Sequence, residues 1–413
     1  MAHIVFREPI STPDQLRLMQ EDARFDVSDQ QDVEHTCIPD LTAIAGDIRA
    51  KPGPPKVPKL MVSNDCRFNC AYCGCRCGNE QRQRYTNEPK EIARLACQEA
   101  VKNGHGVFLT SSICRDADYT EELIVAALKC MREELHYPGY IHAKIMPGAD
   151  PLLIEQAGRY ANRLSVNIEV ANSAGYARIA RQKTRENILA PMGQISRLIR
   201  QHKAETGRTG RRFATSQTTQ LMAGSTGETD RTILTLSKAL YRKYGLKRVY
   251  YTAFHYRHPA AGYDLPYVDT PSWRMARLYQ ADRLMELYGF TPEEIAPEQA
   301  PDLEESIDPK LSWALRHLDR FPVEVGRADY ETLLRVPGIG VVYAQRILEA
   351  RRFGPVSFET LQKLGVSMQR SRYFLQCGGR YGGGDLLEHP ERLRRLLGSD
   401  PEQLLLSPSG CLQ

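Results

Sequence analysis

The chain has 413 residues, 42% of them hydrophobic and 25% charged, which is typical of a soluble globular protein with more than one ordinary core. No apolar run reaches membrane-spanning length, and Met1–Ile10 lacks the pattern of a secretory signal. The net charge of +5 points to no class of partner. Eleven cysteines without disulfide-framework spacing predict a cytoplasmic protein with reduced thiols. The lack of a membrane-spanning run predicts no membrane contact.

Composition and periodicity divide the chain into segments. The first shows no clear long period and ends in the Pro-rich run Lys51–Lys56, which cannot be helical. The predicted divisions are an N-terminal extension at 1–55, an α/β domain at 56–295, a connecting segment at 296–326, a small helical module at 327–377, and a Gly-rich linker with a C-terminal tail at 378–413.

Three cysteines follow the first predicted strand. Cys66, Cys70 and Cys73 are separated by three and then two residues, and Tyr72 directly precedes the last of them. Three thiolates do not complete a tetrahedral structural zinc site, but they can bind three irons of a cubane cluster and leave the fourth iron open. The spacing therefore predicts a [4Fe-4S] cluster on the loop that leaves this strand.

Other cysteines leave two alternatives open for the metal. Cys75 and Cys77 lie close enough in sequence to complete a zinc site, although the Cys-x-Cys-x-Cys spacing suits one tetrahedral ion poorly. A second cluster is the other alternative. Its ligands would come from Cys37, Cys75, Cys77, Cys114 and Cys377.

Short β-like runs alternate with amphipathic helical stretches after the extension. This alternation predicts a parallel sheet with right-handed crossovers, and six repeats are fewer than the eight of a complete barrel. We expect a partial barrel, with a doubly wound open sheet as the alternative; both bind ligands at the carboxyl ends of their strands. The predicted strands are 59–63, 106–111, 140–146, 163–170, 216–223 and 247–254, and the predicted helices are 88–102, 119–135, 151–160, 184–203 and 228–244.

Three of the predicted strands carry polar residues on one alternating face. Because helices cover a parallel sheet from outside, such a face points to a hydrated interior that binds a polar ligand. The alternative is the solvent-exposed face of an antiparallel sheet. The polar residues are His142, Lys144, Ser165, Asn167, Glu169, Thr218 and Gln220.

The segment Leu334–Leu348 reads as a helix, a Pro-Gly-Ile-Gly turn and a second helix. Gly338 and Gly340 permit positive φ and close backbone approach, and amides at the start of the second helix favour phosphate. This pattern resembles the helix–hairpin–helix motif, which binds a nucleic-acid backbone. Residues 353–366 resemble a shorter partner hairpin.

Basic residues concentrate in the same module. Seven basic and two acidic residues lie between Leu333 and Gln376, whereas the remainder of the chain carries 48 of each sign. The excess favours nucleic acid over the alternative of a helical pair that only packs on the barrel. The predicted contact residues are Arg335, Gly338, Gly340, Arg346, Arg351 and Arg352.

The order of cysteine loop, partial barrel and hairpin module resembles the radical S-adenosylmethionine (radical SAM) superfamily, and within it the proteins assigned to DNA modification or repair. The resemblance implies a TIM-like partial (β/α)6 barrel that uses a [4Fe-4S] cluster to cleave S-adenosyl-L-methionine reductively to a 5′-deoxyadenosyl radical. It implies a nucleic-acid substrate, DNA rather than RNA, and an electron donor such as flavodoxin or ferredoxin. The implied cofactor contacts are Tyr72, Ser111, Ser112, Asn167, Glu169, Gln220 and Gly224.

The chain departs from the family pattern at one point. Ser111 and Ser112 stand where relatives carry the Gly-Gly-Glu run that holds the methionine amine. The sequence identifies no residue as catalytic. The same chemistry on RNA or on a peptide is the first alternative. The second is a non-catalytic iron–sulfur protein that binds nucleic acid.

Overall fold

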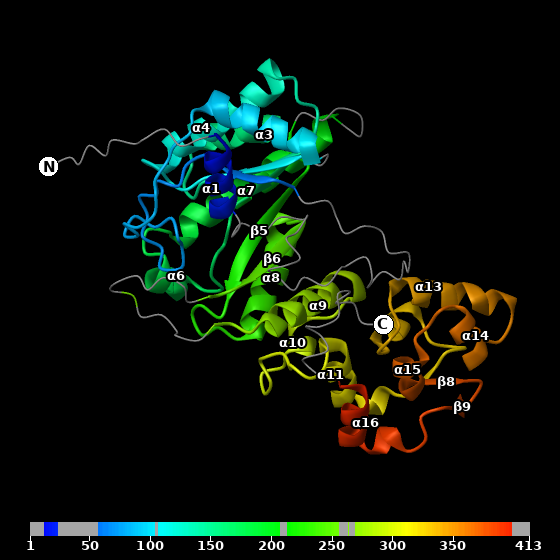
Figure 1. Ribbon diagram of the computed structural model, residues 1–413. Coiled ribbons are helices and arrows are strands. Elements are labelled where there is room, and N and C mark those ends of the chain that lie inside the picture. The colour runs from blue at the N-terminus through cyan, green and yellow to red at the C-terminus, as the bar shows by residue number, and fades with distance from the viewer. Residues whose placement is uncertain are drawn as a thin grey trace. The chain divides into compact units, whose positions relative to one another are not determined.

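The computed structural model describes residues 12–23, 57–103, 106–206, 213–255, 263 and 269–398 (Figure 1). These residues form two compact units. The first contains the described residues up to Gly227 and those between Leu240 and Thr270, and the second contains Glu228–Ala239 and the described residues from Pro271 onward. Cys37 and the run Lys51–Lys56 lie outside the described residues.

Six parallel strands form the sheet of the first unit, and their order in the sheet is their order in the chain (Figure 1). In a doubly wound sheet the order of the strands reverses at a switch point, and in this sheet the order does not reverse. The sequential order therefore confirms the predicted partial barrel. The strands are β1 (Lys59–Met61), β2 (Val107–Thr110), β3 (Ile141–Lys144), β4 (Arg163–Ser165), β5 (Ser216–Ala223) and β6 (Arg248–Ala253).

Helices connect the successive strands, as the alternation predicts. Asp116 and Asp150 begin two of them, because each side chain accepts a hydrogen bond from a backbone N–H of the first helical turn. An additional N-terminal helix, α1 (Thr12–Ala23), contacts β1. The other helices are α3 (Pro89–Asn103), α4 (Ala117–Lys129), α5 (Pro151–Tyr160), α6 (Ser173–Ile179), α7 (Arg185–Thr206) and α8 (Asp230–Tyr244), and a π-helical turn at Cys130–Glu134 follows α4.

The fourth strand is shorter than the predicted range 163–170. Ser165 pairs with Thr218, and the next bridge joins Glu169 to Leu221, so β4 uses one residue more than β5 between the two pairs. This is a β-bulge, which interrupts regular pairing and changes the direction of the side chains beyond it. The strict alternation expected for this strand therefore ends after Ser165.

The second unit is mainly helical. Its core contains Trp313, whose ring packs edge-on against Phe290 at 5.3 Å and Phe321 at 6.3 Å between centroids. Its elements are α9 (Ser272–Tyr288), α10 (Pro292–Ile295), α11 (Pro309–Arg316), β7 (Val323–Glu324), α12 (Tyr330–Arg335), α13 (Val341–Ala350), α14 (Phe358–Lys363), α15 (Met368–Ser371), β8 (Leu375–Cys377), β9 (Arg380–Tyr381) and α16 (Pro390–Leu397).

A three-stranded sheet, β7-β8-β9, has its last strand in the segment from 378 onward that the sequence predicts as a linker. Gly378 and Gly379 have φ of +58° and +76° and form the turn between β8 and β9. Their N–H groups donate to the Glu324 carboxylate at 3.1 and 3.0 Å. The glycines serve a tight turn because few other residues adopt positive φ at two successive positions.

Within the described ranges, no helix combines the length and apolar character needed to cross a membrane.

Candidate functional site

The three predicted cluster ligands lie on the loop that leaves β1. Cys70 is buried, and Cys66 and Cys73 are partly buried and pack against Met61 together with Cys75. The backbone of this loop is held to α6 by a hydrogen bond from Ala71 N–H to the Ile179 carbonyl (2.8 Å). The loop therefore presents its thiols next to the carboxyl end of the first strand.

The three loop thiols lie near one another, because the Cys73 thiol contributes to the raised pKa of both Cys66 and Cys70. Among the residues that the structure describes, no three His, Cys, Asp or Glu side chains form a group that could hold one metal ion. Thiolates that each bind a different iron of a cluster stand farther apart than thiolates that share one ion.

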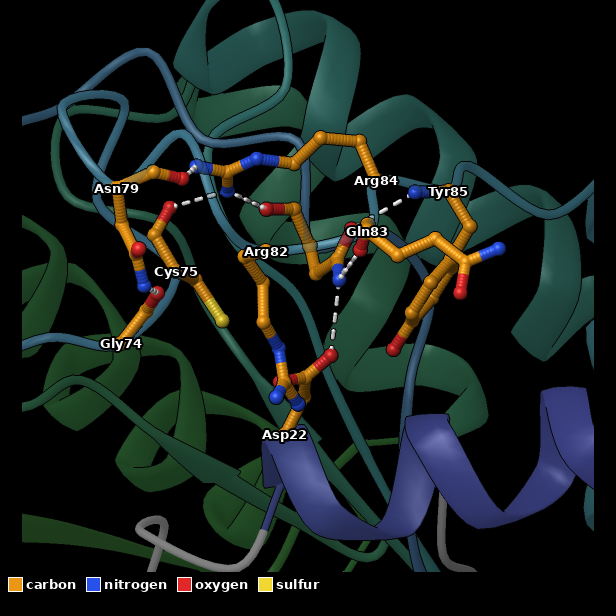
Figure 2. Close-up of polar contacts among 9 residues, drawn as sticks. Asp22, Gly74, Cys75, Asn79, Arg82, Gln83, Arg84 and Tyr85 are labelled. Carbon is orange, nitrogen blue, oxygen red and sulfur yellow. Dashed lines mark hydrogen bonds and ion pairs between the residues drawn. The ribbon is translucent and has the colours of Figure 1, made fainter. Parts of the chain in front are cut away.

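Arg84 fixes the path of the chain around the cysteines (Figure 2). Its guanidinium donates to the carbonyls of Asn64 (2.6 Å), Cys75 (2.7 Å), Arg76 (2.6 Å) and Asn79 (3.0 Å). Four carbonyls on both sides of the cysteine motif are thus bound by one planar cation. Arg84 holds the loop in one shape without contributing a ligand.

Helix α1 adds a buried carboxylate to this network. Asp22 forms an ion pair with Arg82 (Figure 2). It also accepts a hydrogen bond from Asn64 Nδ2 at 2.9 Å. The Asn64 side chain in turn accepts from Tyr85 N–H at 2.8 Å. The N-terminal helix is therefore anchored to the segment that carries the cysteines.

A charged pair that the sequence analysis did not find lies beside the thiols. Lys183 donates to Glu169 at 2.7 Å and to the hydroxyl of Tyr72 at 3.1 Å, and both charged side chains are largely buried. Lys183 follows α6 in the chain and belongs to no motif, so only tertiary structure brings it to Tyr72. Glu169 and Tyr72, by contrast, are predicted site residues that the structure brings together.

The β4 bulge delivers Glu169 to this position. Glu169 has φ of +62°, a left-handed conformation that is uncommon for a residue other than glycine. Thr219 supports the bulge, because its hydroxyl accepts from Ile168 N–H at 2.9 Å and donates to the Val166 carbonyl at 2.7 Å. The strained backbone therefore places a carboxylate in the site.

Burial and charge act in opposite directions on the free thiols. Burial raises the pKa of Cys66 to about 11 and that of Cys70 to about 12, while the nearby Lys183 ammonium opposes both shifts. A hydrogen bond from Cys75 lowers the pKa of Cys73 to about 7. Burial also lowers the pKa of Lys183, but Glu169 and the thiols outweigh it and raise that pKa above its usual value, so Lys183 is cationic.

The interior face of the sheet is polar, as predicted. Lys144, Ser165 and Thr218 lie in register on three neighbouring strands. The hydroxyls of Ser165 and Thr218 are buried and have no hydrogen-bond partner within the described part of the protein. Such groups are costly unless a ligand or water satisfies them, so they mark a place for a polar molecule.

The remaining predicted cofactor contacts also lie at this edge of the sheet. Ser111 and Ser112 directly follow β2, and the Ser112 hydroxyl is buried without a partner among the described residues. Asn167 and Gln220 are buried, and Gly224 has φ of +86° and faces Thr270 so closely that a Cβ would collide with its hydroxyl. Gly224 therefore has a conformational reason to be glycine.

In the second unit, α12 and α13 are joined by the first hairpin (Val336–Gly340), as the sequence predicts. Gly338 has φ of +85°, whereas Gly340 is extended at the start of α13. Arg335 forms an ion pair with Glu294 (2.8 Å) and lies 3.8 Å from the Phe290 ring centroid. Its role as a phosphate contact stays a prediction.

The other predicted arginines differ in exposure. Arg346 is exposed and donates to the Leu364 carbonyl at 3.1 Å. Arg351 is partly buried and donates to the Ala328 carbonyl at 2.5 Å, and Arg352 is exposed. The structure thus brings only part of the predicted basic set to the surface.

Comparisons with known proteins find similar solved structures but no matching family or curated protein. A scan against models of protein families finds no match, and a search of curated proteins finds no significant one. Among solved structures, the chain is similar to the FeFe-hydrogenase maturase HydG from Carboxydothermus hydrogenoformans, with 17% identity over 55% of this chain and 51% of that chain and a TM-score of 0.41.

A second structure of HydG, described as a maturase of the [FeFe]-hydrogenase, matches with 16% identity over 55% of this chain and 48% of that chain and a TM-score of 0.37. The chain spans about half the length of both. Similarity at this level carries no argument about function.

Proposed function

We propose that the protein is a radical SAM enzyme in which Cys66, Cys70 and Cys73 bind three irons of a [4Fe-4S] cluster. The observation that carries the proposal is the cysteine loop itself, which holds three thiols at the carboxyl end of a strand beside a polar barrel interior. When bound, the cluster supplies the electron for reductive cleavage of S-adenosyl-L-methionine at its open iron. A small electron-transfer protein such as a flavodoxin or ferredoxin would supply that electron.

The residues present fit this cofactor pair. The chain supplies three thiols on one loop, and Lys183 beside them adds a positive charge that offsets the charge of three thiolates. The unpartnered hydroxyls of Ser112, Ser165 and Thr218 give a polar cofactor hydrogen-bonding partners. The barrel's task is to position the cofactor and exclude water.

We further propose S-adenosyl-L-methionine contacts from the polar residues at the strand ends. Glu169, held by the bulge, is the only one that is also ion-paired to Lys183 among the described residues. The contact residues are Tyr72, Ser111, Ser112, Asn167, Glu169, Gln220 and Gly224.

Nucleic acid is the proposed substrate, with DNA favoured over RNA. Its support is the concentration of basic residues between Leu333 and Gln376 and the occurrence there of two short helix–turn–helix pairs, α12–α13 and α14–α15. Small backbone turns that carry glycine and cations are suited to phosphate. We propose that the reaction modifies or repairs nucleic acid, as the resemblance to radical SAM proteins of that kind implies.

Turnover tests the chemistry. Anaerobically reconstituted and reduced protein should convert S-adenosyl-L-methionine to 5′-deoxyadenosine, and Cys66→Ala, Cys70→Ala or Cys73→Ala should abolish the product. Cys97→Ala is the matched control, because Cys97 is a partly buried thiol on α3 outside the loop. Undiminished product from the three loop variants would refute the assignment.

Deuterium transfer tests the substrate. Deuterated DNA, RNA and peptide substrates should be compared for label in 5′-deoxyadenosine, and DNA is expected to give the most. Label from RNA or peptide alone would assign the chemistry to those substrates. Absence of any S-adenosyl-L-methionine turnover, with nucleic acid still bound, would indicate a non-catalytic iron–sulfur protein.

A further inference from the structure

We propose that the second unit contacts nucleic acid through its second hairpin, Leu364–Ser367 between α14 and α15, together with Arg346, Arg352, Phe353 and Lys363. The first hairpin matches the sequence motif better, but its cations are neutralised within the unit. This inference rests on the proposed nucleic-acid substrate and names the surface that would bind it.

The two hairpins are packed reciprocally. A Cβ added to Gly338 of the first hairpin would lie 3.3 Å from Arg370 Cβ on α15. A Cβ added to Gly365 of the second would lie 3.4 Å from Tyr343 and 3.9 Å from Arg346 Nη1 on α13. Each turn therefore rests on the second helix of the other pair, and Arg370 and Arg346 occupy equivalent places.

The equivalent arginines have different partners. Arg370, beside the first hairpin, forms an ion pair with Asp308, and Arg335 forms one with Glu294. The buried Lys310 ammonium donates to the carbonyl of Ile339 within the same turn at 2.5 Å. Cations already paired with carboxylates add little to phosphate binding, because the existing pair must be given up first.

The second hairpin keeps its cations unpaired. In the described part of the chain, Arg346, Arg352 and Lys363 are exposed and none of them lies within ion-pair distance of a carboxylate, and Glu359 on α14 attracts Lys363 only at longer range. Arg346 donates one hydrogen bond to the Leu364 carbonyl, which holds its guanidinium at the turn. When unpaired cations bind phosphates, they displace the counterions condensed on the nucleic acid, and this release provides the binding affinity and its salt dependence.

Phe353 lies in the turn that directly follows α13, the helix that carries Arg346, and provides an exposed aromatic ring. It directly follows Arg352, and 87% of its surface is exposed, which is unusual for a large apolar side chain. An exposed aromatic ring next to cations is suited to stacking on an unpaired base while the cations meet its phosphates. The surface therefore fits a single strand or an unpaired region better than an intact duplex.

Fluorescence anisotropy tests this surface, with labelled single-stranded DNA, duplex DNA and single-stranded RNA of one sequence at several salt concentrations. Arg346→Ala with Lys363→Ala should lower affinity for the single strand at least tenfold and reduce the log–log salt slope by about 1.4, the contribution of two phosphate contacts. Phe353→Ala should cost on the order of tenfold on single strands and much less on duplex.

Three further variants test which hairpin binds and whether net charge alone explains the effect. Val341→Glu places a negative charge at the start of α13, beside the first hairpin and out of i,i+4 register with Arg346, where it stabilises the helix and would repel phosphate; binding should be unchanged. Arg392→Ala removes an exposed charge from α16 and controls for net charge. Glu349→Gln, on α13, should tighten binding, because that exposed carboxylate opposes phosphate.

The outcomes distinguish the inference from the function on which it rests. Loss of binding in Val341→Glu with retention in the Arg346 and Lys363 variant would overturn the second hairpin and leave nucleic-acid binding in place. Wild-type protein that binds none of the three probes at low salt would overturn both. Tighter binding to RNA than to DNA, lost in the same variant, would support the surface and assign it to RNA.

Discussion

At the scale of single residues, buried charge distinguishes this site from an ordinary barrel interior. Lys183 and Glu169 are 13% and 6% exposed and form an ion pair, so each compensates for the cost of burying the other. Removing one member of such a pair leaves an unpaired buried charge. The pair therefore predicts a large asymmetry between single and double variants.

Lys183→Met should lower the free energy of unfolding by about 3 kcal/mol, because Glu169 is then buried without its cation. The double variant with Glu169→Gln should recover most of that loss, since no charge is left to compensate. Urea denaturation of the metal-free protein measures both. Equal losses in the single and double variants would show that the pair is not coupled.

Glu121 gives the clearest pH dependence. It is fully buried on α4, one carboxyl oxygen accepts from Met146 N–H at 2.8 Å, and the other has no partner among the described residues. Burial raises its pKa from 4.5 to about 8. The folded state therefore holds a proton that the unfolded state loses above pH 4.5, and stability falls as pH rises through this window.

We expect Glu121→Gln to remove this dependence, because glutamine resembles the neutral carboxyl. Between pH 5 and 8, the stability of wild-type protein relative to the variant should fall by about 1.4 kcal/mol per pH unit. Urea unfolding at several pH values measures the difference. A constant difference across the window would show that Glu121 does not titrate on unfolding.

At the scale of elements, the cysteine loop depends on a side chain that lies outside the motif. Arg84 binds carbonyls at Asn64, Cys75, Arg76 and Asn79, so loop geometry is set before any iron binds. A preorganised loop should retain a cluster longer than a loose one. Cluster retention is therefore the property that Arg84 controls.

Arg84→Met should leave the three cysteines in place but accelerate loss of the cluster to a chelator several-fold. Arg84→Lys should be intermediate, because an ammonium cannot reach four carbonyls in one plane. Decay of visible absorption measures the rate, and Arg67→Ala, an exposed arginine of the same loop, is the control. An unchanged rate in Arg84→Met would assign Arg84 to folding alone.

At the scale of the whole molecule, local patterns predicted most of the first unit. Alternating β-like and amphipathic runs predicted six parallel strands, and the Cys66–Cys73 spacing predicted the thiol-bearing loop. The pattern did not reveal the β4 bulge, because an extra residue appears only when Glu169 is paired with Leu221. Lys183 was missed for a related reason, since it meets Tyr72 across 111 residues of sequence.

The second unit shows a different limit. Glycine and proline correctly predicted the turn at Val336–Gly340. The sequence did not predict that Arg335 and Arg370 beside this turn form ion pairs, because their partners Glu294 and Asp308 lie outside the hairpin segment. Gly378 and Gly379 were read as linker because a tight turn and a flexible segment use the same residue. The distinction depends on Glu324, a distant carboxylate.

The proposed chemistry depends on three thiolates that leave one iron open for a sulfonium cofactor. Electron paramagnetic resonance of the anaerobically reconstituted, reduced protein tests it, before and after addition of S-adenosyl-L-methionine. We predict a [4Fe-4S] signal whose g-values shift when the cofactor is added, because the cofactor binds the open iron. A cluster signal that does not change, or protein that takes up zinc in place of iron, would contradict the account.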